Sequence, residues 1–183
     1  MAMGRTPTGH SAEEGRMQDV TYITPMFAVT GELVPDDFAE IAKLGFKCVI
    51  SNRPDDEETT QMLARAEAAT AWRHGLKFVH VPAAKLDLFT NAVVEDMADA
   101  LRSIEGPVLA HCKSGLRSAI VWAAASARNQ PVDCVLAALK KAGFDLEFIR
   151  DDLERQADLR RWLGKAAPAL DCGTAVDLDR AAA

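Results

Sequence analysis

The sequence predicts an α/β protein in which a mainly parallel sheet is flanked by helices. Short apolar segments of strand length alternate with amphipathic helical segments through the middle of the chain, and glycine or proline residues separate them. Strands separated by helices are joined by right-handed crossovers, which place neighbouring strands parallel to one another. Beyond residue 118 the segments have helical patterns, so the C-terminal part of the domain is expected to be helical.

Local patterns justify each element. Strands are expected at residues 27–30, 46–51, 77–81 and 108–110, which are short, apolar and partly β-branched. Asp36 or Asp37 is expected to cap the first helix, with Asp37 and Glu40 forming an acidic capping box, and Gly45 ends that helix. The spacing of apolar residues predicts later helices at residues 59–74, 90–104, 118–128, 132–142 and 145–163.

Length and composition indicate one globular domain. The chain has 183 residues, of which 49% are hydrophobic and 26% charged, so a disordered, fibrous or disulfide-scaffold protein is excluded. We expect the domain at residues 21–163, between flexible tails at 1–20 and 164–183 that have little apolar surface to bury. No apolar segment approaches the roughly 20 residues that span a membrane, and no signal-peptide pattern is present, so a cytoplasmic location is expected.

Charge and cysteine usage narrow the partners and cofactors. The net charge of -6 disfavours nucleic acids and anionic membranes as partners, because their phosphate groups would be repelled. The four cysteines include no CxxC pair, and without an export signal they are expected to be reduced thiols. The four histidines have no metal-binding spacing, so neither a metal nor another cofactor is expected. The sequence does not indicate an oligomeric state.

One segment carries the chemistry, and it joins the strand at 108–110 to the helix that follows it. Ligands of open α/β sheets bind at the carboxyl ends of strands, where this segment lies. Its backbone N–H groups, beside the positive end of a helix, can converge on an anion, and a guanidinium group can grip an oxyanion with two donors. The residues expected to bind substrate in this anion-binding loop (residues 112–117) are Lys113, Ser114, Gly115, Leu116 and Arg117.

Cys112 begins the anion-binding loop and is the expected nucleophile. Converging amides, a helix N-terminus and Arg117 all favour its thiolate form, which is the reactive form of cysteine. The other cysteines lack this setting. Cys48 lies in an apolar strand, Cys134 lies on an amphipathic helix, and Cys172 lies in the C-terminal tail.

The octapeptide HCKSGLRS at residues 111–118 resembles the active-site loop of cysteine-dependent tyrosine and dual-specificity phosphatases. Three further motifs, TPMFAVTG at 24–31, GFKCVISNRPD at 45–55 and VHVP at 79–82, are similar to the phosphatase-like domain of bacterial beta-lactamase hydrolase-like proteins. This resemblance covers residues 22–128. It implies a cysteine-phosphatase-like fold of the dual-specificity type.

The same resemblance implies roles for residues around the loop. His111 would orient the loop and help to keep Cys112 ionised, and Ser118 would donate to the thiolate or help it to leave. Phosphatases supply a general acid from the segment before the helix that leads to the cysteine strand, and Asp87 stands at that position. An ordinary exposed loop aspartate is the alternative interpretation of Asp87.

Asn52 and Arg53 follow the strand at 46–51 and are candidate substrate-binding residues. Because parallel strands end at the same edge of a sheet, both side chains would reach the pocket of the anion-binding loop. In that pocket Arg53 would help to bind an anionic substrate. A solvated turn containing Pro54 would explain the same residues without any contact with substrate.

The length of the anion-binding loop departs from the phosphatase pattern. Phosphatases place five residues between the cysteine and the arginine, whereas four stand between Cys112 and Arg117. This shorter loop is similar to the Cys-x-x-Gly-x-Arg loop of rhodanese-type sulfurtransferases, which carry a persulfide. A rhodanese domain, however, usually returns to another strand after the helix that follows its loop, and this chain continues as helices.

The leading hypothesis is therefore a phosphatase-like hydrolase that forms a thiophosphoryl intermediate on Cys112. Its substrate would be a small anionic or phosphorylated molecule. The alternative is a sulfurtransferase that carries a persulfide on the same cysteine and accepts sulfur from a donor such as thiosulfate or a persulfide. A third hypothesis is a non-catalytic module that only binds anions.

Overall fold

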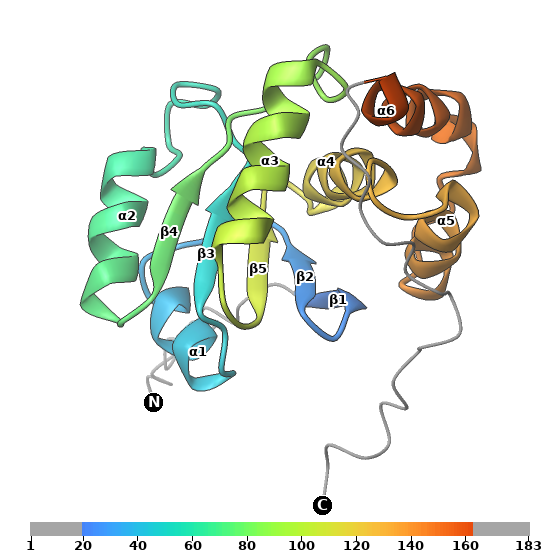
Figure 1. Cartoon of the computed structure of the whole chain (residues 1–183). Coiled ribbons are helices and arrows are strands. Elements are labelled where there is room, and N and C mark those ends of the chain that lie inside the picture. Colours follow the sequence, from blue (N-terminus) through green and yellow to red (C-terminus); the bar gives the residue numbers. More distant parts are fainter. Residues whose placement is uncertain (1–19, 163–183) are drawn as a thin grey trace, which may run out of the picture.

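A five-stranded sheet forms the centre of the protein, whose computed structural model describes residues 20–162 (Figure 1). The strand order is β1-β2-β5-β3-β4, and only β1 runs antiparallel to its neighbour. The elements are β1 (Thr21–Thr24), β2 (Phe27–Thr30), α1 (Asp37–Lys43), β3 (Cys48–Ser51), α2 (Ala64–Arg73), β4 (Lys77–His80), α3 (Asn91–Ser103), β5 (Val108–His111), α4 (Leu116–Ala127), α5 (Val132–Lys141), the 3₁₀ helix η1 (Glu147–Ile149) and α6 (Arg150–Trp162). The predicted α/β class with a mainly parallel sheet is thus confirmed.

The proposed domain limits are not tested by this structure. The expected tails at 1–20 and 164–183 lie outside the described residues, apart from residue 20. The domain at 21–163 therefore stays a prediction. None of the helices within residues 20–162 combines the length and apolar character needed to cross a bilayer.

The parallel register aligns the carboxyl ends of four strands. His111, at the end of β5, pairs with Thr30 of β2 on one side and with Ser51 of β3 on the other, and Ser51 pairs with His80 of β4. The segments that leave these strands therefore start along one edge of the sheet. Since β5 is the central strand, the anion-binding loop starts in the middle of that edge.

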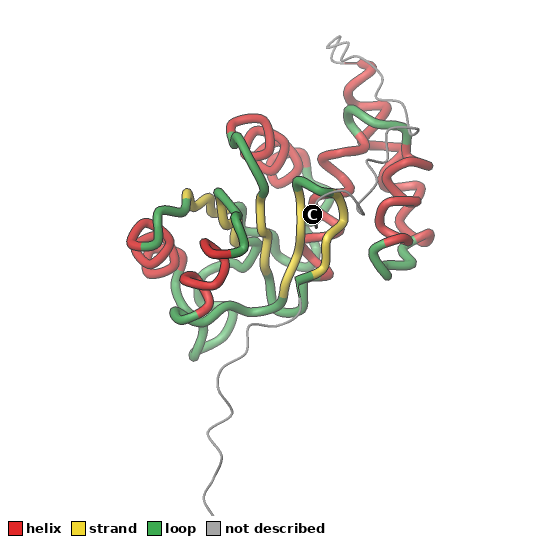
Figure 2. The backbone as a smooth tube through the Cα atoms, turned by 90° about the horizontal axis from the view of Figure 1, so that it is seen from below, coloured by secondary structure: helices red, strands yellow, loops and turns green. Residues whose placement is uncertain are grey.

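Alternating strand residues pack against two helical layers, with the strands between helices on either side (Figure 2). On one face, Ala28, Val49 and Leu109 pack with α1 and α2. On the other face, their strand neighbours pack with α3, α4, α5 and α6. This alternation follows from the two-residue period of a strand, and burial on both faces explains why these strands are continuously apolar.

Helix α4 is buried along nearly its whole length. Every residue from Arg117 to Ala127 is buried, and only Leu116 at its start is exposed. Alanine-rich stretches leave room for close neighbours, and α4 packs against α3, α5 and α6, which gather beside it in Figure 1. The helix that begins at the anion-binding loop is therefore held firmly by the C-terminal helices.

Two predicted helix starts are wrong, because side chains make contacts that local patterns do not show. The Asp37 carboxylate accepts a hydrogen bond from the Val34 N–H at 2.8 Å, so the expected capping box does not form, and Asp36 makes no side-chain cap contact. Helix α2 begins at Ala64 rather than near residue 59, because the Ala64 N–H donates to Asp55 Oδ1 at 2.7 Å.

Other differences concern β1, the last predicted helix and one cysteine. Strand β1 was not predicted, and it adds the antiparallel edge to the sheet. The helix expected at 145–163 is divided into η1 and α6. Cys48 and Cys112 are free thiols, but Cys134 is disulfide-bonded, so the expectation that every cysteine is reduced is wrong for Cys134.

The packing of α1 generates a prediction about stability. Phe38 is fully buried against the sheet, so Phe38→Ala should lower the free energy of unfolding by about 3–5 kcal/mol through lost burial and a cavity. Urea denaturation followed by circular dichroism measures this change. The matched control is Trp72→Ala, which removes an aromatic side chain that is 80% exposed and should change stability by at most about 0.5 kcal/mol. Equal effects of both substitutions would contradict the packing described.

Candidate active site

The anion-binding loop joins the end of β5 to the start of α4. Cys112 follows β5 directly, is a free thiol and is only 1% exposed. Gly115 precedes α4 with a φ of +82°, a conformation that side chains disfavour. A Cβ on Gly115 would also lie 3.2 Å from the Thr30 carbonyl oxygen at the end of β2. Glycine therefore lets the loop turn tightly over the sheet edge and start the helix.

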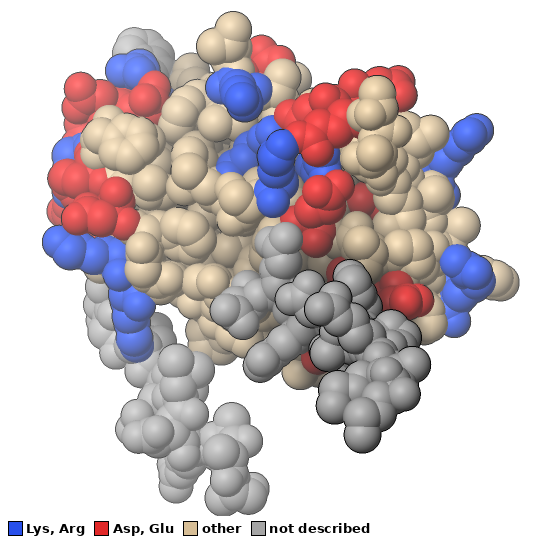
Figure 3. Space-filling model, turned by 180° about the vertical axis from the view of Figure 1, so that it is seen from behind, with Lys and Arg blue, Asp and Glu red and all other residues tan. Residues whose placement is uncertain are grey.

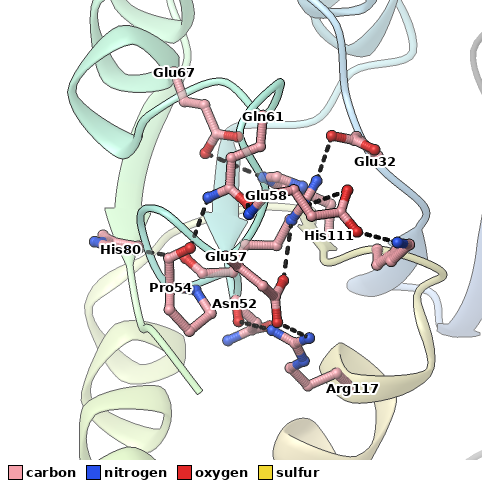
Figure 4. Close-up of polar contacts among 12 residues, drawn as sticks. Glu32, Asn52, Pro54, Glu57, Glu58, Gln61, Glu67, His80, His111 and Arg117 are labelled. Atoms are coloured by element: carbon pink, nitrogen blue, oxygen red, sulfur yellow. Dashed lines mark hydrogen bonds and ion pairs between the residues drawn. The ribbon is translucent and has the colours of Figure 1, made fainter. Parts of the chain in front are cut away.

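Arg117, in the first turn of α4, is held by one side of its guanidinium group. NH1 donates to the Asn52 carbonyl oxygen at 3.2 Å, and NH2 donates to Glu57 Oε1 at 2.6 Å (Figure 4). Its Nε–H has no hydrogen-bond acceptor among the described residues. These contacts fix the direction of the guanidinium group and leave a donor for an oxyanion.

A cluster of acidic side chains surrounds the second arginine, Arg53, which is 3% exposed (Figure 4). Its NH1 group donates to Glu32, its Nε lies 3.3 Å from Glu57 Oε2, and its NH2 lies 3.3 Å from Glu58 Oε2. Glu57 therefore bridges Arg53 and Arg117 through its two oxygens. Glu58 also forms an ion pair with Lys113, so the segment after β3 is tied to the anion-binding loop twice.

The charges in this cluster stabilise one another. Partial burial opposes ionisation of Glu57, but hydrogen bonds and charge from Arg117 and Arg53 outweigh it and lower the pKa of Glu57. Burial likewise opposes the charge of Arg53, but the hydrogen bond and charge of Glu32, with Glu57 and Glu58, raise its pKa. The cluster therefore consists of ionised groups at neutral pH.

His111 is fully buried and contacts a carboxylate from another helix. Its Nε2 lies 3.3 Å from Oε2 of Glu67 on α2, and Glu67 is itself almost completely buried. Within residues 20–162, neither His111 Nδ1 nor the buried Ser118 hydroxyl has a hydrogen-bond partner. Both groups are thus available polar atoms next to the anion-binding loop in sequence.

Asn52 connects three segments at the carboxyl edge of the sheet. Its N–H donates to the His111 carbonyl oxygen at 2.9 Å, and its side-chain amide donates to the Val81 carbonyl oxygen at 3.0 Å. Its own carbonyl oxygen accepts from Arg117 and from the Ala83 N–H. These contacts give Asn52 a bridging position between β3, the segment after β4 and the anion-binding loop.

Asp87 lies apart from these contacts, on an exposed turn before α3. Its N–H donates to the Ala84 carbonyl oxygen at 3.0 Å, and its carbonyl oxygen accepts from the Thr90 N–H at 2.9 Å. Its carboxylate has no hydrogen bond or ion pair among the described residues. The structure thus joins Arg117, Asn52 and Arg53 by direct contacts but leaves Asp87 outside that network.

Sequence reasoning missed the four glutamates that organise the site. Glu57 and Glu58 belong to an acidic run directly after β3, and Glu57 stands four residues after Arg53, which is the only local signal for an ion pair. Glu32 and Glu67 come from segments far from their partners in sequence. Residues 20–162 contain no group of three or more acidic, histidine or cysteine side chains placed to hold a metal ion.

Comparison with known proteins identifies the family. The family model for the phosphatase-like domain of beta-lactamase hydrolase-like proteins matches residues 19–129. The chain belongs to this family. Beta-lactamase hydrolase-like proteins from Xylella fastidiosa and Agrobacterium fabrum are 36% and 31% identical to it, over 137 and 138 residues. These matches cover 74% of the chain but 32% of each relative, so the phosphatase-like domain described here spans about a third of their length.

Solved structures give the fold. The crystal structure of a candidate phosphatase from Neisseria meningitidis is 30% identical and superposes with a TM-score of 0.64, covering 74% of this chain and 96% of that one. A kinase associated phosphatase, at 14% identity and a TM-score of 0.58, covers 84% and 100%. The phosphatase-like domain therefore has the fold of tyrosine and dual-specificity phosphatases, as the sequence predicts.

The lowered pKa of Glu57 predicts how stability depends on pH. The ionised carboxylate stabilises the fold above the ordinary glutamate pKa of 4.5, and this contribution is lost as the pH falls through the lower folded-state pKa. Glu57→Gln should therefore be less stable than the wild type at pH 7, and the difference should shrink in acid. Thermal unfolding between pH 7 and pH 3 measures it. Glu105→Gln, an exposed position with no described ion pair, should show no such trend.

Proposed function

We propose that the phosphatase-like domain hydrolyses a phosphate monoester through a covalent intermediate on Cys112. The observation that carries this proposal is the arrangement of Arg117. It follows a free cysteine in a strand–loop–helix turn, its outer nitrogens are held by Asn52 and Glu57, and its Nε–H has no described protein acceptor. An oxyanion beside Cys112 would take that donor together with the loop amides.

In the first step the Cys112 thiolate attacks phosphorus in line with the leaving oxygen. The S–P bond forms while the P–O bond to the leaving group breaks, and the negative equatorial oxygens are stabilised by Arg117 and by the backbone N–H groups of the loop. Asp87, in its protonated form, donates a proton to the leaving alkoxide. The products of this step are an alcohol and a thiophosphoryl cysteine.

In the second step water attacks the same phosphorus. The Asp87 carboxylate accepts a proton from the water, the S–P bond breaks, and inorganic phosphate leaves with the thiolate of Cys112 restored. Ser118 donates a hydrogen bond to that thiolate, and His111, held by Glu67, orients the start of the loop. Lys113 and Arg53 contribute positive charge around the site once substrate is bound, and their glutamate partners keep the two side chains in place.

One observation favours a second candidate function, a sulfurtransferase with a persulfide on Cys112. The loop has four residues between Cys112 and Arg117, so it offers one amide fewer than a phosphatase loop of five. A persulfide bears one charge on one sulfur and needs fewer donors than three phosphate oxygens. In that reaction Cys112 attacks the outer sulfur of a donor such as thiosulfate, releases sulfite and passes the sulfur to a thiophile.

Cys112 is predicted to be the one thiol that turnover requires. Cys112→Ser should reduce hydrolysis of 4-nitrophenyl phosphate by about 1,000-fold or more, because the nucleophile is removed. Iodoacetate at mildly acidic pH should label Cys112 before Cys48, and inorganic phosphate should protect it. Burial raises the pKa of Cys48 to about 11, with only partial compensation by Lys77, so its thiol is far less reactive.

Cys48→Ala is the matched control for this experiment. Cys48 is a buried free thiol like Cys112 but faces the core, so the variant should keep wild-type turnover if it folds. Retained hydrolysis in Cys112→Ser would eliminate the covalent mechanism. Protection by phosphate without any turnover would instead support the non-catalytic anion-binding module.

Arg117 and Asp87 should distinguish phosphate transfer from sulfur transfer. Arg117→Lys keeps the charge but loses the planar donors, so phosphatase turnover should fall by about 100-fold or more. Asp87→Asn removes the general acid and should lower hydrolysis of phenyl phosphate, whose leaving group needs a proton, more than that of 4-nitrophenyl phosphate. One protein preparation is assayed with the phosphate esters and with thiosulfate plus cyanide.

Each reaction has its own outcome in this comparison. Losses of phosphatase turnover in both variants support the phosphatase. Strong thiosulfate turnover that neither variant changes would support the sulfurtransferase and rule out the leading proposal. The Arg155→Lys variant, on the exposed side of α6, is the control for a change from arginine to lysine away from the site.

A further inference from the structure

A buried polar cluster connects the C-terminal helix α6 with the segment that carries Asp87. Arg128, at the end of α4, donates from Nε and NH2 to Gln156 Oε1 at 3.0 and 2.9 Å, and NH2 also donates to Asn91 Oδ1 at 2.6 Å. Its NH1 lies 3.5 Å from Glu95 Oε2 on α3. Gln156 is 3% exposed, so its amide is a specific contact within the core rather than a surface interaction.

The other end of the Gln156 amide reaches the segment before α3. Gln156 Nε2 donates to the Phe89 carbonyl oxygen at 2.8 Å. Arg128 withdraws electron density from the amide oxygen, which strengthens the amide N–H as a donor. The Phe89 carbonyl is therefore held by a polarised donor that belongs to a helix more than sixty residues further along the chain.

The segment with Asp87 is consequently fixed at both ends. At its start, the Ala83 N–H donates to the Asn52 carbonyl oxygen at 3.3 Å, and this oxygen also accepts from Arg117. At its end, Phe89 is fixed by Gln156. Between these points only short-range backbone contacts hold the turn around Asp87. The place of Asp87 relative to the anion-binding loop thus depends on both attachments.

Gln156 lies outside the part of the chain that the family model matches, which ends at residue 129. We infer that Gln156 is a positioning residue for the reaction: through the Phe89 carbonyl it holds Asp87 where the leaving group needs its proton, so α6 belongs to the catalytic unit without touching substrate. This inference rests on the proposed function, in particular on the role of Asp87 as general acid.

The decisive variant is Gln156→Glu. A glutamate keeps the oxygen that accepts from Arg128, and with it the docking of α6, but loses the N–H that holds the Phe89 carbonyl. The kcat with phenyl phosphate should fall about 10-fold, because general-acid catalysis depends on placement, while the kcat with 4-nitrophenyl phosphate should fall less than about 2-fold. KM should not change, because the anion-binding loop is untouched. Arg155→Ala, on the exposed side of the same helix, should leave both kcat values unchanged.

A double-mutant comparison separates positioning from general destabilisation. Asp87→Asn combined with Gln156→Glu should be no slower on phenyl phosphate than Asp87→Asn alone, since a missing acid cannot be misplaced. Multiplying losses, or equal losses on both esters, would overturn the inference. If Gln156→Glu unfolds at the assay temperature, Gln156→Ala replaces it with the same expected pattern.

The proposed function and this inference fail in different ways. If Asp87→Asn shows no dependence on the leaving group, the proposed acid is wrong, and the positioning role is overturned with it. If Asp87→Asn shows that dependence and Gln156→Glu does not, only the positioning role is overturned.

Discussion

The bridge that Glu57 makes between Arg53 and Arg117 is the interaction on which the rest of the site depends. A buried guanidinium group is costly to desolvate unless a carboxylate compensates it, and here one carboxylate serves two arginines. Because Arg117 is held through NH1 and NH2, its direction is set before any substrate arrives. Preorganised donors of this kind are more effective than donors that must reorient during the reaction.

The sheet places this bridge where it can act. Asn52 and Arg53 follow β3, Cys112 follows β5, and the two strands are neighbours with Ser51 beside His111. The Asn52 carbonyl oxygen then joins Arg117 to the segment that leads toward Asp87. Buried helix α4 supports the other end of the loop, so the site consists of short segments attached to rigid elements on each side.

Sequence patterns predicted the strands and the anion-binding loop well, because their signals are local. An apolar β-branched segment, a glycine at a tight turn and an arginine in the first helical turn each follow from neighbouring residues. The same reasoning failed for the capping box, because the Asp37 carboxylate bonds backward to Val34. It could not predict the contact between Glu67 and His111, whose partners are 44 residues apart and meet only after the sheet has formed.

The pairing of charges at the site also affects how a substrate would approach. Arg53, Lys113 and Arg117 are matched by Glu32, Glu57 and Glu58, three carboxylates for three cations. The face in Figure 3 likewise has acidic and basic side chains interspersed. Opposite charges at contact distance cancel in the far field, so this cluster exerts little long-range attraction on an anion. An anionic substrate would meet the site by ordinary diffusion, and its rate of encounter would change little with ionic strength, unlike that of an enzyme with an uncompensated basic funnel.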